Sequence, residues 1–193
     1  MPKYIFIFAA IIFLPFYLDS EIIAYWSLDD LSGSTAKDSI GHNDGTVYGA
    51  TQQVSGVRGY AYQFDGINDY VEMEGFDFFG GDGDTEWVAG AGRENWTTVA
   101  WIKPFSIGNN AAQTKFQGGD FISQGGYSND IYYFHVCEGS KVALYLDESD
   151  AGVTSPADTI QANQWYHVAV TGSATNGLRL YVNGSLVDSY TNS

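Results

Sequence analysis

The stretch that decides the fold is residues 164–188, QWYHVAVTGSATNGLRLYVNGSLVD. Apolar and polar side chains alternate over 166–171 and again over 178–183, which is the period of a half-buried strand. Asn176-Gly177 precedes the second run and Asn183-Gly184 follows it. Asn-Gly between alternating apolar runs is the strongest short-range signal of a β-hairpin. The stretch therefore predicts three short strands joined by two tight turns.

Length and composition extend this prediction to the whole chain. A length of 193 residues fits one domain with a sizeable core. Aromatic residues make up 16% of the chain and there are 23 glycines, a balance that favours short strands and tight turns over helices. We expect further strands at 22–28, around Val47, and at 58–64, 70–73, 96–103, 120–124, 130–137 and 141–147. About ten strands with turn residues between them predict an all-β sandwich or barrel.

The charge of the chain limits its partners. Twenty-three acidic residues against eight basic ones give a formal net charge of -15. Such an excess argues against binding to nucleic acid or to an anionic membrane surface, because both carry dense negative charge. It suits cation binding, or simply keeps the protein in solution.

The N-terminus indicates export. Met1-Pro2-Lys3 is followed by YIFIFAAIIFLPFYL, an apolar run of signal-peptide length that is short for a membrane span. We therefore expect residues 1–20 to be a signal peptide, residues 21–193 to be the domain, and the protein to be secreted; the alternative is a membrane anchor. The single cysteine, Cys137, excludes an intrachain disulfide. We expect it to be a small buried residue at a strand end, the alternative being a partner thiol beyond the C-terminus.

Four blocks of the sequence occur in an order that is similar to one family. They are IIAYWSLDDLSGSTAKDSIGHNDGTV, GYAYQFDGINDYVEM, WTTVAWIKP, and QWYHVAVTG with LRLYVNGSLV. Together they resemble the laminin-G-like domains of the concanavalin A-like lectin/glucanase superfamily over nearly all of 22–190. The resemblance implies a two-sheet antiparallel jelly-roll sandwich. The family's closing hairpin, of the GxIDDVRIYNRAL kind, has no counterpart before Ser193, so we expect a domain truncated at its C-terminus with an exposed sheet edge.

The sequence gives little support for catalytic activity. Glycosidases of the laminarinase type need two carboxylates on one strand, as in E-x-D-x-x-E, placed about 5 Å apart. The nearest match is Glu148-Ser149-Asp150, but Val153 stands where the second glutamate belongs. Glu72-Met73-Glu74 places two carboxylates on one side of a strand without the third. No Ser or Cys has a nucleophile-elbow context. We predict a non-catalytic domain, with a degenerate glycosidase as the weaker alternative.

A calcium site is predicted in the first loop. Calcium prefers six to eight oxygen ligands from carboxylates, amides and backbone carbonyls. Asp29, Asp38, Asn43 and Asp44 bracket a loop that has such groups, and the resemblance implies a structural calcium site in this region. The alternative is that Asp38, Asn43 and Asp44 are turn formers whose side chains bond their own backbone.

A carbohydrate-binding face is predicted from strand alternation. Sugars stack their apolar faces on aromatic rings while nearby polar groups take the hydroxyls. If Leu178, Leu180 and Val182 point into the core together with Val142, Leu144 and Leu146, alternate residues point outward. On the strand at 130–137 the phase is open, since either Tyr133 and His135 or Tyr132 and Phe134 face out. We predict one sheet face for an extended polysaccharide, formed by Tyr133, His135, Tyr145, Arg179 and Tyr181. The alternative is that the tyrosines are strand formers that cover a second layer buried by loops.

The leading functional hypothesis is a secreted, non-catalytic carbohydrate-binding module from a larger extracellular protein, with a possible structural Ca2+. Its partner would be a glycan or polysaccharide. The alternative is an extracellular protein-interaction or adhesion module of the laminin-G type, because one fold serves several functions.

Overall fold

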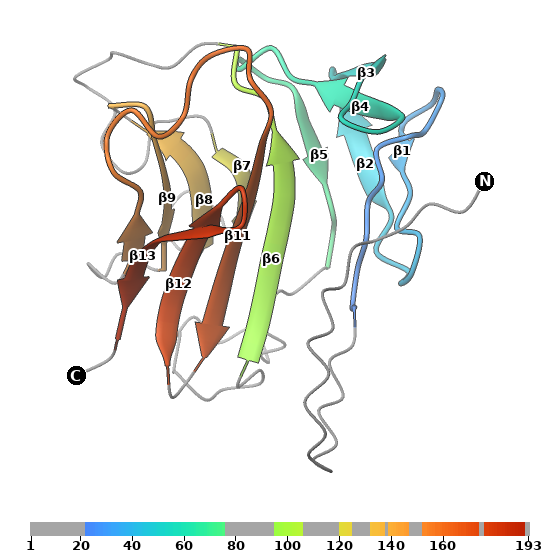
Figure 1. The fold of residues 1–193 in the computed structure, drawn as a ribbon. Helices are drawn as coiled ribbons and strands as arrows, with labels where there is room; N and C mark the ends of the chain where they lie inside the picture. The colour runs from blue at the N-terminus through green and yellow to red at the C-terminus, as the bar shows by residue number, and fades with distance from the viewer. Residues whose placement is uncertain are drawn as a thin grey trace.

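The computed structural model describes residues 22–75, 95–105, 120–124, 132–137, 139–146, 152–173 and 176–191. Strands and their connections make up these residues, and no helix occurs among them (Figure 1). The all-β prediction is therefore confirmed. In the same described part, no helix has the length and apolar character needed to cross a membrane. The predicted signal peptide falls outside the described residues and stays a prediction.

One four-stranded antiparallel sheet contains the stretch that decided the fold. Its strands, in the order β13-β12-β11-β6, are β6 (Asn95–Ile102), β11 (Tyr166–Ser173), β12 (Gly177–Val182) and β13 (Ser185–Tyr190). Strands β11 and β12 pair from Val168↔Val182 to Ser173↔Gly177, and β12 returns through Asn183-Gly184 into β13. Gly177, Asn183 and Gly184 all have positive φ, as tight turns of this kind require. The predicted hairpins are confirmed.

A second four-stranded antiparallel sheet lies behind the first in Figure 1. Its strands, in the order β10-β9-β8-β7, are β7 (Asp120–Gln124), β8 (Tyr132–Cys137), β9 (Lys141–Tyr145) and β10 (Gly152–Thr154). At one edge the two sheets are joined by Asp188 of β13, whose Oδ2 accepts a hydrogen bond of 2.7 Å from the backbone N–H of Thr154 in β10.

The N-terminal region forms two small sheets beside the sandwich (Figure 1). The first contains β1 (Thr35–Ala36), β2 (Gly45–Tyr48) and β5 (Tyr70–Glu72), and the second contains β3 (Thr51–Ser55) and β4 (Tyr60–Gln63). The strand predicted at 22–28 is wrong, because this segment makes only an isolated bridge between Trp26 and Asp38. Side-chain contacts hold it instead: the backbone N–H of Tyr25 bonds Asp38, and the indole N–H of Trp26 bonds the carbonyl of Asn43.

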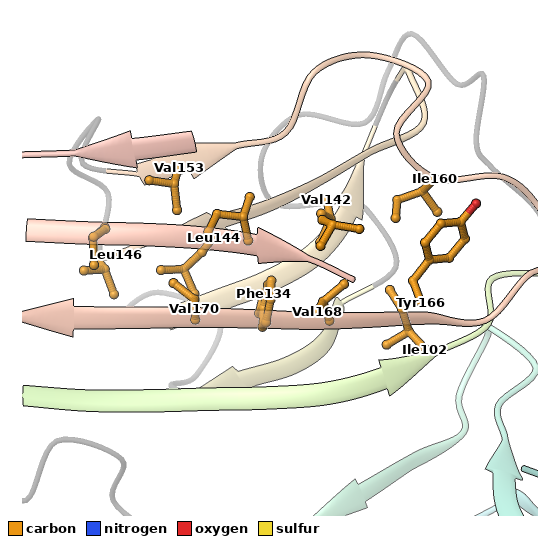
Figure 2. Close-up of a cluster of buried hydrophobic side chains, with 13 residues drawn as sticks. Ile102, Phe134, Val142, Leu144, Leu146, Val153, Ile160, Tyr166, Val168 and Val170 are labelled. Atoms are coloured by element: carbon orange, nitrogen blue, oxygen red, sulfur yellow. The ribbon is translucent and has the colours of Figure 1, made fainter. Parts of the chain in front are cut away.

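The core lies between the two four-stranded sheets. Side chains from β8 and β9 meet those from β11 and β12 in one cluster, part of which Figure 2 shows. Each large apolar side chain buried here stabilises the fold by about 1.5–3 kcal/mol. The cluster comprises Ile102, Phe134, Val142, Leu144, Leu146, Val153, Ile160, Tyr166, Val168, Val170, Leu178, Leu180 and Val182. The inward phase predicted for 142–146 and 178–182 is confirmed, and this phase determines which side chains face outward.

Candidate functional site

The side of the β6–β11–β12–β13 sheet that faces away from the core presents an unusual set of exposed side chains. Because Ile102, Val168 and Leu180 lie in the core, their strand neighbours must point outward. We call this surface the outer face. It consists of Thr97, Val99, Trp101, His167, Ala169, Thr171, Arg179, Tyr181, Leu186 and Ser189.

The strand register arranges the outer face in rows that cross the sheet. Trp101 of β6 lies opposite His167 of β11. The next row is apolar and runs Val99, Ala169, Tyr181, Leu186 across all four strands. The third row is polar and runs Thr97, Thr171, Arg179, Ser189. An apolar row is thus flanked by an aromatic pair on one side and by hydroxyl and guanidinium groups on the other.

Three large apolar side chains of the outer face stand in solvent. Val99 is 56% exposed, Trp101 53% and Leu186 54%. Apolar residues of this size usually contribute to the core, and single exposed ones carry no meaning. Here Val99 and Trp101 neighbour one another on one side of β6, and Leu186 closes the same row as Val99 at the far edge. Because large exposed apolar side chains on one face are typical of binding surfaces, the outer face is the candidate site.

Trp101 is held by its neighbour on β11. The rings of Trp101 and His167 meet edge to face, with centroids 5.3 Å apart and planes inclined at 69°. His167 is fixed by its backbone, which exchanges hydrogen bonds with Asn183: its N–H donates to Asn183 Oδ1 at 3.0 Å, and its carbonyl accepts from the Asn183 N–H at 2.7 Å. Burial lowers the pKa of His167, so the imidazole is neutral at neutral pH. The aromatic pair therefore carries no charge.

The outer face differs in charge from the rest of the protein. None of its ten residues is Asp or Glu, although the chain has 23 acidic residues. Arg179 is its one permanently charged residue and is exposed to solvent. The face can therefore offer aromatic stacking, aliphatic contact and hydroxyl or guanidinium hydrogen bonds without repelling a polar partner.

The predicted carbohydrate-binding residues do not share one face. Arg179 and Tyr181 lie on β12 and belong to the outer face. Tyr133 and Tyr145 pair with each other on β8 and β9, in the other sheet, and Tyr145 faces away from the core there. The side chain of Tyr133 is outside what the structure describes. Because the core separates the sheets, the single five-residue face predicted from the sequence is wrong.

His135 requires a second correction. Phe134 is fully buried in the core, which settles the open phase and places His135 on the opposite side of β8. His135 is nevertheless only 1% exposed, and Ala143, its partner on β9, is 0% exposed. The His135 ring packs against Tyr145 at 5.5 Å between centroids. The prediction of an exposed His135 is wrong. On this side of β8 the alternative applies, in which the outward side chains form a second layer that is itself covered.

Val99, Trp101 and His167 are functional candidates that were not predicted from the sequence. The signal was present, since residues 96–103 alternate and an inward Ile102 places Trp101 and Val99 outside. What the sequence lacked was the pairing of β6 with β11, which brings Trp101 to His167 across more than 60 positions of chain.

A comparison with known protein families agrees with this architecture. The family model described as the concanavalin A-like lectin/glucanases superfamily matches residues 76–193, which is more than half of the chain and includes both four-stranded sheets. The chain belongs to this superfamily. At the level of the family it is a carbohydrate- or protein-binding module. A search of curated proteins found no match.

The predicted calcium loop of this superfamily member is organised around Asp38, which is 8% exposed. Its Oδ1 accepts hydrogen bonds from the backbone N–H groups of Tyr25 and Ile40, at 2.9 and 3.1 Å. Its Oδ2 accepts from the backbone and side-chain N–H groups of Asn43, at 3.3 and 3.0 Å. Asp44 Oδ1 in turn accepts from the N–H of Asp38 at 2.9 Å. Apart from the bond from Tyr25, which lies 13 positions away, these are the contacts expected of turn-forming side chains.

The loop does not fit calcium as it stands. The carboxylate oxygens of Asp38 already face N–H donors, and Asp29, the fourth predicted ligand, bonds the N–H of Tyr60 at 2.8 Å instead of joining Asn43 and Asp44. Throughout the described ranges, no group of three or more His, Cys, Asp or Glu is arranged to hold a metal. Calcium binding is thus untested, and it would require the Asp38 carboxylate to exchange N–H donors for the metal.

The carboxylates weighed for catalysis are not assembled by the described structure. Glu148 and Asp150 lie outside the described residues. Glu72 lies on β5 opposite Thr46, in the small N-terminal sheet. Cys137 ends β8 opposite Lys141 and is a half-buried free thiol, so the predicted strand-end position is confirmed and full burial is not.

Proposed function

We propose that this domain is a non-catalytic carbohydrate-binding module that takes a neutral polysaccharide on its outer face. The observation that carries the proposal is the Trp101 ring, which is 53% exposed and is supported edge-on by His167 within a face free of carboxylates. An exposed, fixed and uncharged ring loses little entropy when it stacks against a sugar.

The rows of the outer face suit an extended polymer. A sugar ring stacked on Trp101 lies beside the apolar row of Val99 and Tyr181, which can take the aliphatic face of the next unit. The hydroxyls of Thr97 and Thr171 and the guanidinium of Arg179 then supply donors and acceptors for sugar hydroxyls. Exposed residues of the face lie on β6, β12 and β13, so a long chain can contact it from one edge of the sheet to the other.

A protein ligand is the second candidate function. Val99 and Leu186 are more than half exposed, and both lie in the apolar row. Aliphatic groups of this kind suit a protein surface as well as a sugar, and aromatic residues are enriched in protein interfaces. The superfamily allows either ligand class.

Binding measurements separate these two candidates. Tryptophan fluorescence and affinity electrophoresis should detect a neutral polysaccharide from a panel of glucans, xylans and galactans. Trp101→Ala and Tyr181→Ala should each weaken that binding, whereas Ile67→Ala, which removes an apolar side chain that is 86% exposed and lies off the face, should not. A folded protein that ignores the whole panel and captures a protein ligand through Trp101 would establish the second candidate.

The proposal also covers where the domain acts and whether it hydrolyses its ligand. We propose that the module is exported through residues 1–20 and acts outside the cell, on the strength of the apolar N-terminal run. We propose that it lacks hydrolytic activity, because the sequence has no E-x-D-x-x-E arrangement. Release of reducing sugar that stops on changing Glu72 or Glu148 would contradict this.

A further inference from the structure

The small N-terminal sheet carries a second group of exposed aromatic side chains, remote in sequence from the outer face. Tyr48 of β2 lies directly opposite Tyr70 of β5. Their rings are stacked, with centroids 4.5 Å apart and planes inclined at 20°. Tyr48 is 41% exposed and Tyr70 is 49% exposed. The pair therefore forms a preassembled aromatic surface in solvent.

The register places polar groups on the same side of this sheet. Thr46 lies opposite Glu72, two positions from the tyrosine pair on each strand, so all four side chains share a face. Thr35 of β1 pairs with Thr46 and extends the row. All of these residues are exposed. We call this surface the tyrosine face; it consists of Thr35, Thr46, Tyr48, Tyr70 and Glu72, with Glu74 just beyond the end of β5.

The carboxylates lie close enough to the rings to act together with them. The negative charge of Glu72 raises the pKa of Tyr48, and burial, the neighbouring Tyr70, a hydrogen bond with Glu72 and the charge of Glu74 all add in the same direction. A cation placed over the tyrosine rings would therefore meet the ring faces and one or two carboxylates at once. Aromatic rings attract cations through their quadrupole, and a nearby carboxylate adds to that attraction.

The tyrosine face is thus opposite in electrostatic character to the outer face, which has no carboxylate. The net charge of -15 favours approach of a polycation from a distance. The threonine hydroxyls beside the rings suit hydroxyl partners, which a sugar has and a lysine side chain lacks. We propose that the tyrosine face is a second carbohydrate site that binds an amino-sugar polymer, with the sugar rings against Tyr48 and Tyr70 and a free ammonium group at Glu72.

The proposal predicts a dependence on both ring and charge. The titrations are made at about pH 5.5, where the amino groups of the polymer are protonated. Calorimetric titration should show binding of a fully deacetylated chitin oligomer, and the N-acetylated oligomer of the same length, which has the same rings without the charge, should bind about tenfold more weakly. Tyr70→Ala and Glu72→Gln should each weaken binding of the deacetylated oligomer about tenfold. Added salt should also weaken binding of the deacetylated oligomer to the protein that retains Glu72, because ions screen its attraction to Glu72.

Two variants keep the test independent of folding and of the outer face. Glu72→Gln is nearly isosteric and retains an acceptor for the Tyr48 hydroxyl, so its melting temperature should match the wild type even if Tyr70→Ala is destabilised. All titrations are made in a Trp101→Ala background, which removes stacking of either oligomer on the outer face, so that the binding that remains reports the tyrosine face. If no neutral polysaccharide of the panel binds the wild type, that result overturns only the outer-face proposal.

Three results would overturn the inference at the tyrosine face. The first is equal affinity for the acetylated and deacetylated oligomers. The second is an oligolysine peptide that binds as tightly and with the same sensitivity to Tyr70 and Glu72, which would assign the face to a basic peptide. The third is an affinity for the deacetylated oligomer that neither Tyr70→Ala nor Glu72→Gln reduces.

Discussion

Trp101 on β6 and His167 on β11 face each other across the strand pair, with ring centroids 5.3 Å apart in an edge-to-face arrangement. An edge-to-face pair of this geometry is favourable in itself, because the positive edge of one ring meets the negative face of the other. The histidine therefore fixes an exposed tryptophan that would otherwise sample several rotamers. Fixing the ring before the ligand arrives reduces the entropy lost on binding.

Replacing Trp101 tests the outer face most directly. Trp101→Ala should weaken binding of the neutral polysaccharide by about tenfold or more, equal to about 1.4 kcal/mol, because the stacking surface is lost. The melting temperature should change little, since the side chain is 53% exposed and lies outside the core cluster. Fluorescence titration with the best polysaccharide of the panel measures the effect. Unchanged affinity in a folded Trp101→Ala protein would remove the outer face from consideration.

His167 gives the fold a defined pH dependence. Burial lowers the pKa of His167 in the folded protein below the value of about 6.5 in the unfolded chain. The unfolded chain therefore takes up the proton first, so stability falls as the pH drops through about 6.5 and stops falling below the folded pKa. Melts between pH 7.5 and 5 should show this loss in the wild type and less of it in His167→Gln. Thr97→Ala, which changes a residue of the same face that does not titrate, is the control and should show the wild-type loss.

Local features of the fold were predictable because they have local causes. Asn183-Gly184 fixed the turn between β12 and β13, and the two-residue period of 178–183 fixed which side of β12 enters the core. The inward phase of Leu144 followed in the same way. Each of these depends on neighbours within a few positions of the chain.

Sheet membership could not be predicted in this way. Alternation places both Tyr145 and Tyr181 on the outer side of a strand, but it does not tell that β9 and β12 lie in different sheets. That depends on pairings such as β6 with β11, between segments far apart in sequence. The burial of His135 escaped prediction for a related reason, since it depends on what covers the second side of β8. The candidate site changed accordingly, from one face of five residues to the face that carries Trp101.

Gly172 of β11 tests the packing of the core edge. It is buried opposite Trp96 of β6, and a Cβ added to Gly172 would collide with the indole ring of Trp96. Gly172→Ala should therefore destabilise the protein by about 1–3 kcal/mol, as overpacking does. Chemical denaturation measures this, with Thr171→Ala as the control on the neighbouring, outward position. In a double-mutant cycle, Trp96→Leu should absorb much of the cost of Gly172→Ala, since the ring that blocks the Cβ is gone. Strict additivity would show that the collision is relieved elsewhere.

Titration with calcium tests the loop that contains Asp38, Asn43 and Asp44, for which the sequence predicts a calcium site. If calcium binds at Asp38, Asn43 and Asp44, millimolar calcium must raise the melting temperature of the wild type, because a ligand of the native state stabilises it. The shift should disappear in Asp44→Asn. With Asp38 already surrounded by N–H donors, we expect no shift with calcium at neutral pH, and a clear rise would show that the loop rearranges around the metal.

Asp38 should make the N-terminal region sensitive to acid. Burial alone would raise the pKa of Asp38, but hydrogen bonds from the N–H groups of Tyr25, Ile40 and Gly41, together with the Asn43 amide, outweigh it and hold the pKa well below the usual value. A carboxyl with a lowered folded pKa stabilises the protein fully above its unfolded pKa of about 3.9, and this contribution is lost as the pH falls through that value toward the folded pKa. Asp38→Ala removes the acceptor of several part-buried N–H groups and should cost about 1–3 kcal/mol. Hydrogen exchange locates the effect, since the amides of Tyr25 and Ile40 should lose protection in Asp38→Ala and, in the wild type, below about pH 4.

The control is Asp65→Ala. It removes a carboxylate that bonds the N–H of Ile67 in an exposed turn, and it should leave the Tyr25 and Ile40 amides protected. Loss of protection in both variants alike would mean that the N-terminal sheets open as one unit and that Asp38 has no special part in holding 22–44 together.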